Sequence, residues 1–253
     1  MRFIHLADVH LGAKPDQRYP WSLGRGEEIW DTFRQVIEEA GQQKIDLLLI
    51  AGDLFHGQPL LRELREVNYL FSTIPDTAVV LIAGNHDYLG RDSFYHGIQP
   101  WNSNVFFMRE PTLQRVALPG LHTYVYGLSY HSRQITENLY RDACPGGEEG
   151  FHILLAHGGD GQHIPIDFGL LGQAGFSYVA LGTYPSTSDD SEKWDGEYGL
   201  CGELGACGKA RGRSSWIYTG GIQGRQVELG AGEEGQEKLR DVAFPCRERD
   251  EPI

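Results

Sequence analysis

The sequence has little cysteine, no long hydrophobic run and no excess of basic residues. Only four of its 253 residues are cysteines, and three of them lie in the last quarter of the chain, which is not the pattern of a disulfide framework. No apolar stretch approaches the length of a membrane span, and the N-terminus lacks the features of a signal peptide. We therefore expect a cytoplasmic protein with no membrane partner.

The chain carries 22 lysines and arginines against 35 aspartates and glutamates, a formal net charge of −13. This balance argues against a broad basic surface that wraps around nucleic acid. If the substrate is a phosphodiester, bound cations and a local patch must attract it. A hydrophobic content of 40% in a chain of this length is enough to bury the core of one large α/β domain, alone or with an appendage.

The hydrophobic pattern predicts an alternation of strands and helices over the first 182 residues. Strands are expected at 2–7, 46–51, 78–83, 105–108, 113–118, 121–128, 151–156 and 178–181, and helices at 27–42, 59–74, 132–141 and 168–174, with a short helical turn at 93–97. Beyond Gly182 the chain is rich in Gly, Glu, Arg and Ser and shows hydrophobic patterning only at 215–218 and 242–244. We expect a folded domain over 1–182 and a divergent, poorly ordered tail over 183–253.

Polar residues follow directly after four of the predicted strands. Ligands bind at the carboxyl ends of strands in open α/β sheets, and buried polar groups need partners, so these residues are candidates for one shared site. They are Asp8 and His10, Asp53, the run Asn85-His86-Asp87, and His157.

Hard oxygen ligands and imidazoles are the donor set that two adjacent divalent cations require, with one carboxylate shared between them. Asp53 follows a glycine, which lets the chain turn tightly and present the carboxylate as that bridge. His86 lies next to a candidate ligand but points differently, so it is free to give a proton to a leaving oxygen. Isolated histidines such as His5, His122 and His152 are expected to be structural.

Four sequence blocks carry a resemblance to a known family. The blocks 6–12 (LADVHLG), 51–56 (AGDLFH), 84–87 (GNHD) and 155–159 (LAHGG) resemble the calcineurin-like metallophosphoesterase superfamily, in its DNA repair exonuclease branch of SbcD and YhaO type. The resemblance implies an α/β fold in which a two-sheet β sandwich is flanked by helices, an αββα arrangement. It also implies a site with two Mn²⁺ ions.

By this resemblance Asp8 and His10 bind the first cation, Asp53 bridges, Asn85 and His157 bind the second, and His86 stabilises or protonates the leaving group. The implied partners are DNA ends and an SMC-like ATPase with a long coiled coil. A homodimer is a further candidate assembly.

The chain departs from the family pattern after the strand at 178–181. The family continues with Gly-His-x-His, and both histidines bind metal, whereas this chain has Gly182-Thr183-Tyr184-Pro185. Our hypothesis is a one-base insertion in the coding sequence near the Gly182 codon. A shifted Gly-His-Ile-His can be read as Gly-Thr-Tyr-Pro, and a shifted Tyr-Ala-Gly-Ser-Leu-Glu-Pro as residues 200–206. Each metal then loses a ligand, and impaired activity is expected.

Three functions remain open from the sequence. The residues of the four motif blocks, which resemble those of the DNA repair branch, favour a metal-dependent DNA exonuclease or endonuclease subunit. The acidic balance favours a phosphodiesterase or phosphatase that acts on small molecules. The missing histidines favour a catalytically inactive binding subunit.

Overall fold

A computed structural model describes residues 1–15, 24–97 and 100–182, together with the backbone of four strands that follow. These four are β9 (Tyr198–Leu200), β10 (Ile217–Gln223), β11 (Gln226–Gly232) and β12 (Val242–Ala243). Thr183, Tyr184 and Pro185, on which the frameshift hypothesis rests, lie outside the described residues.

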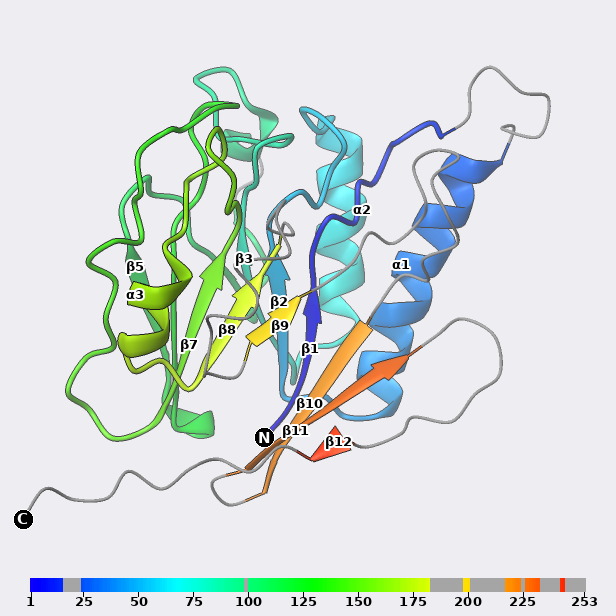
Figure 1. The fold of residues 1–253 in the computed structure, drawn as a ribbon. Coiled ribbons are helices and arrows are strands. Elements are labelled where there is room, and N and C mark those ends of the chain that lie inside the picture. Colours follow the sequence, from blue (N-terminus) through cyan, green and yellow to red (C-terminus); the bar gives the residue numbers. More distant parts are fainter. Residues whose placement is uncertain are drawn as a thin grey trace, which may run out of the picture.

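The described strands form two sheets (Figure 1). The first has the order β12-β11-β10-β1-β2-β3-β4, and its strands β1 to β4 run parallel. Its N-terminal strands are β1 (Arg2–Leu6), β2 (Leu47–Ala51), β3 (Ala78–Ile82) and β4 (Val105–Phe107). On its other side β1 pairs antiparallel with β10, with Ile4 opposite Thr219.

The second sheet has the order β5-β6-β7-β8-β9. Its strands before residue 183 are β5 (Gln114–Leu118), β6 (Thr123–Gly127), β7 (Phe151–Ala156) and β8 (Tyr178–Leu181). All pairs from β6 to β9 are parallel, and only β5 is antiparallel to its neighbour. β9 therefore extends this sheet and β10 extends the first. The proposed division of the chain at residue 182 stays a prediction.

Helices cover the outer faces of the two sheets (Figure 1). α1 (Arg25–Gln42) and α2 (Leu61–Ser72) pack against the first sheet, and the short α3 (Phe168–Gln173) packs against the second. Two 3₁₀ turns, η2 (Phe94–His96) and η3 (Pro119–Leu121), lie in connections. None of the described helices combines the length and the apolar character needed to cross a membrane.

The strand β2 shows why the sheets stack. All five of its residues are fully buried, and alternate side chains point to opposite faces. Leu48 and Ile50 pack with the helices, whereas Leu47 and Leu49 pack with residues of the second sheet. The order of layers is thus helices, sheet, sheet, helix, and the expected αββα sandwich is confirmed.

The helix predicted at 132–141 is wrong. In this segment Ile135 makes two backbone hydrogen bonds outside the local chain, from its N–H to the carbonyl of Gln162 (2.9 Å) and to its carbonyl from the N–H of Ile164 (2.7 Å). The side chain of Asn138 accepts a bond from the N–H of Tyr140 (3.1 Å), which forms a local turn. These bonds replace helical ones, so tertiary pairing overrides the periodicity of Ile135 and Leu139.

Candidate metal centre

The loops after β1 and β2 are joined by backbone hydrogen bonds. The N–H of Asp8 donates to the carbonyl of Gly52 (3.3 Å), and the N–H of His10 donates to the carbonyl of Asp53 (3.0 Å). Asp8, His10 and Asp53 all have positive φ angles, of 49°, 53° and 50°. This left-handed conformation is unfavourable for residues with a Cβ atom and clusters at functional sites. Potential ligand atoms of the three side chains lie within 4.8 Å of one another.

Two glycines permit the close approach of these loops. Gly52 has a φ of +86°, and a Cβ atom there would lie 2.6 Å from Nδ1 of His157. A Cβ atom on Gly84 would lie 2.1 Å from Oδ1 of Asp53. Either substitution would push apart groups that now converge, so these glycines are part of the site.

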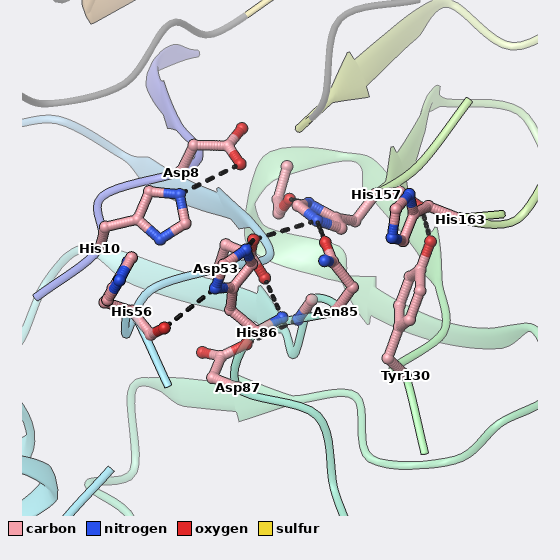
Figure 2. Close-up of polar contacts among 12 residues, drawn as sticks. Asp8, His10, Asp53, His56, Asn85, His86, Asp87, Tyr130, His157 and His163 are labelled. Atoms are coloured by element: carbon pink, nitrogen blue, oxygen red, sulfur yellow. Dashed lines mark hydrogen bonds and ion pairs between the residues drawn. The ribbon is translucent and has the colours of Figure 1, made fainter. Parts of the chain in front are cut away.

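His157 follows β7 and brings the second sheet to the site. Its Nδ1 lies 2.8 Å from the carbonyl oxygen of Ala51 and therefore donates to it, which leaves Nε2 facing the other residues. Nε2 lies 2.8 Å from Oδ1 of Asn85 and 3.5 Å from Oδ2 of Asp53 (Figure 2). Asp53 is thereby common to two groups of side chains, one with Asp8 and His10 and one with Asn85 and His157.

The group formed by Asp53, Asn85 and His157 favours a positive charge on the ring of His157. Burial alone would lower the pKa of His157, but the charge and hydrogen bonding of Asp53 outweigh it and raise the pKa. Burial likewise opposes ionisation of Asp53, but His157 and the N–H of His86 hold its pKa below the usual range. The proton on Nε2 stands between a carboxylate oxygen and an amide oxygen. A divalent cation would meet the same oxygens there and release the proton, so the donor set fits a metal.

His86 is fixed by two hydrogen bonds. Its N–H donates to Oδ1 of Asp53 (2.8 Å), and its ring Nδ1 donates to the carbonyl of His56 (2.9 Å). Its Nε2 lies 4.0 Å from Oδ2 of Asp53. The His86 side chain is 28% exposed, whereas that of Asp53 is 2% exposed. His86 is therefore oriented by the site and still reachable by a substrate.

Asp87 is a buried residue that holds two loops of the site together. Its fully buried carboxylate accepts hydrogen bonds from the N–H of Gly84 (2.8 Å), the N–H of Phe55 (3.2 Å) and the hydroxyl of Tyr95 (2.8 Å). Burial, and then the nearby charge of Asp53, raise its pKa to about 6. These bonds fasten the loop after β2 to the loop after β3.

His56 also lies at this site, although the sequence pattern did not single it out. The ring centre of His56 lies 5.3 Å from that of His10 and 5.3 Å from that of His86. Its position three residues after Asp53, in a loop already placed at this edge, was the available signal. The isolated histidines have other roles: His5 contacts the hydroxyl of Tyr178 (3.2 Å) and His152 that of Tyr126 (3.1 Å).

Carboxylate, amide and imidazole groups at the carboxyl ends of parallel strands in two stacked sheets are the arrangement of metal-dependent phosphoesterases. Comparison with known proteins agrees. The profile of the calcineurin-like phosphoesterases matches residues 1–182, and the chain belongs to this family.

Three relatives show the range of similarity. The chain is 29% identical over 202 residues to an uncharacterized metallophosphoesterase, YhaO, of Bacillus subtilis, covering 72% of this chain and 48% of the relative. It is 27% identical over 192 residues to the DNA double-strand break repair protein Mre11 of Methanocaldococcus jannaschii, covering 72% and 50%. It is 38% identical over 103 residues to Mre11 of Archaeoglobus fulgidus, covering 38% and 22%. The chain thus spans about half the length of these relatives, or less.

Proposed function

We propose that this chain is a metal-dependent phosphodiester hydrolase that acts on DNA ends as a nuclease of the DNA repair type. The observation that carries the proposal is the position of Asp53, whose carboxylate belongs to the group with Asp8 and His10 and also lies 3.5 Å from Nε2 of His157. One carboxylate shared by two donor groups is what a pair of cations requires. The names of the Mre11 relatives support DNA as the substrate.

In this proposal Asp8, His10 and Asp53 would hold one cation, and Asp53, Asn85 and His157 the other. The carboxylate-rich set suits Mn²⁺, the cation that the family resemblance implies. When bound, such a pair activates water for attack on phosphorus and neutralises the charge that develops on the phosphoryl oxygens.

His86 is the proposed proton donor to the leaving oxygen. Its Nδ1 is occupied by the carbonyl of His56, so only Nε2 can face the substrate. In the protonated imidazolium this Nε2–H is a donor on the exposed side of the site. Asp53, through the hydrogen bond from the backbone of His86, ties the position of this donor to that of the shared carboxylate.

The absence of Gly-His-x-His favours a second candidate, a chain with weak or no catalysis that acts as a binding subunit. By the family resemblance, Thr183 and Pro185 stand at the positions where two histidine ligands are expected. Even a disturbed group behind a ligand reduces metal affinity or activity ten- to a hundredfold, so the loss of two ligands should cost at least that much. The small-molecule phosphodiesterase remains the other alternative, on the acidic charge.

The test is hydrolysis by the full chain, freed of metal and then supplied with Mn²⁺. Linear duplex DNA and a small chromogenic phosphodiester serve as parallel substrates. Release of nucleotides that depends on Mn²⁺ and disappears in Asp53→Asn supports the nuclease. Turnover of the small diester alone supports the small-molecule enzyme, whereas DNA binding without cleavage supports the inactive subunit.

The expected partner, an SMC-like coiled-coil ATPase, and a second copy of the chain are proposals from the family resemblance. This chain covers only about half the length of the relatives from Bacillus subtilis and Methanocaldococcus jannaschii. A full-length relative is therefore a useful comparison when partner binding is measured. Co-purification with a candidate ATPase, with and without DNA, is the direct measurement.

A further inference from the structure

Three histidines from three different loops form a compact triangle at the edge of the site. The ring centres of His10 and His86 are 4.9 Å apart, and each lies 5.3 Å from the ring centre of His56. One potential ligand nitrogen from each ring lies within 4.8 Å of the other two. Figure 2 shows the three rings around a common point beside Asp53.

These spacings match those of a tetrahedral three-histidine metal site. With metal–nitrogen bonds of about 2.1 Å and tetrahedral angles, three imidazole rings have centres about 5 Å apart. The potential ligand nitrogens lie within 4.8 Å of one another, and a bound ion would draw them closer together. The rings of His56 and His86 meet that of His10 at steep interplanar angles of 76° and 74°, and they are inclined by 31° to each other.

His10 supplies an independent observation. Its Nε2 faces Asp8 at 3.8 Å, but its Nδ1 is buried and has no hydrogen-bond partner among the described residues. In Figure 2 this second nitrogen points away from Asp8, toward the side where His56 lies. Buried polar atoms are nearly always satisfied, so this unpartnered nitrogen on the side of His56 is a candidate metal ligand.

His86 is already oriented for the same role. Its Nδ1 is held by the carbonyl of His56, which leaves Nε2 as the ligand nitrogen. A second hydrogen bond that fixes the tautomer and direction of the ring is the usual support of a metal-binding histidine.

We propose that His10, His56 and His86 form a further site, for Zn²⁺, which shares only His10 with the proposed Mn²⁺ ligands. The triangle offers imidazole nitrogens and no carboxylate of its own, a donor set that suits Zn²⁺ and not the harder Mn²⁺. It overlaps the carboxylate group Asp8–His10–Asp53 through His10, so the two groups compete for one ring. If the proposed function holds, Zn²⁺ here also occupies His86 and acts as an inhibitor.

The experiment measures metal binding, not turnover. The full chain is stripped of metal and titrated with Zn²⁺ in competition with a chromogenic chelator, and separately with Co²⁺, whose visible bands report tetrahedral coordination. The key comparison is Asp8→Asn with Asp8→Asn/His56→Asn, because Asp8→Asn weakens the carboxylate group and leaves the triangle intact. The matched control for His56→Asn is His122→Asn, an exposed histidine outside the triangle at a left-handed position that asparagine tolerates.

We expect the Asp8→Asn and His122→Asn variants to keep one equivalent of bound Zn²⁺ and to show tetrahedral Co²⁺ bands. The affinity for this Zn²⁺ should fall at least tenfold when His56→Asn is introduced. His86→Asn should do the same, which guards against an effect peculiar to one variant. Equal Zn²⁺ affinity with and without His56, or loss of all Zn²⁺ in Asp8→Asn, would overturn the proposal. Since no step requires hydrolysis, a failure of the proposed nuclease activity leaves this result readable.

Discussion

Nε2 of His157 lies 2.8 Å from Oδ1 of Asn85, although the two residues are 72 positions apart and follow strands of different sheets. The site therefore exists only when the two sheets are stacked. His157→Gln should lower Mn²⁺ affinity at least ten- to a hundredfold, measured by titration calorimetry of the metal-free chain. The control is His163→Gln, because His163 lies on the same loop but pairs with Asp160. An unchanged affinity in His157→Gln would exclude His157 as a ligand.

His86→Gln tests the proposed proton donor. Since the proposed function places His86 beside the Mn²⁺ ligands and not among them, we expect kcat on a phosphodiester to fall by about 10²- to 10⁴-fold. Mn²⁺ affinity, measured on the same protein, should change by no more than a few fold. A parallel loss of metal would instead assign His86 to the ligand set. An unchanged kcat would remove it from the mechanism.

The proposed loss of two histidine ligands can be tested by placing histidines at the positions where the family resemblance expects them. The double substitution Thr183→His/Pro185→His should raise the Mn²⁺ content found by elemental analysis and increase turnover at least tenfold. If the bound Mn²⁺ does not increase, positions 183 and 185 are not the sites of two lost metal ligands. Sequencing of the gene decides the frameshift hypothesis separately: an intact frame, with no family-like translation one base over, contradicts it.

The hydrogen bond from Tyr95 to Asp87 tests how the site is supported. Tyr95→Phe leaves a buried carboxylate with one partner fewer, so the free energy of unfolding should fall by about 1–3 kcal/mol in denaturant titrations. Tyr69→Phe is the matched control because its side chain is exposed, and we expect less than about 0.5 kcal/mol there. If the two variants are equally stable, the buried hydrogen bond contributes little.

Strands such as β2, β3 and β8 were predictable because each is a short apolar run that is soon followed by glycine and a polar residue. Strand β8 was predicted at its observed bounds, and β2 and β3 to within one residue at each end. Parallel strands present their carboxyl ends at one edge, which is why residues after β1, β2, β3 and β7 could be assigned to one site. The structure then showed which atoms face which, and made Asp53 common to both groups.

Other features could not be read from the chain. The segment around Ile135 has helical spacing, but its backbone bonds go to Gln162 and Ile164, and no local pattern reveals such long-range pairing. His56 was missed because a histidine in a loop is usually unremarkable; only the distances to His10 and His86 give it significance. The role of Asp87 as a buried acceptor depends on Tyr95, eight residues away in a short turn.

The buried His5 makes the stability of the fold sensitive to acid. Burial lowers its pKa from 6.5 to about 3, so the folded chain keeps this ring neutral where the unfolded chain protonates it. Unfolding therefore takes up a proton between these values, and the contribution of His5, present above pH 6.5, is lost as the pH falls toward 3. The effect on the free energy of unfolding should be of the order of a few kcal/mol.

Urea titrations at pH 7, 6, 5 and 4, with a chelator present, test this expectation. The free energy of unfolding should fall more steeply with falling pH for the unaltered chain than for His5→Gln. His10, whose pKa burial lowers to about 4, acts in the same direction in both proteins and so cancels in the comparison. Parallel pH profiles for the two proteins would show that His5 does not carry this dependence.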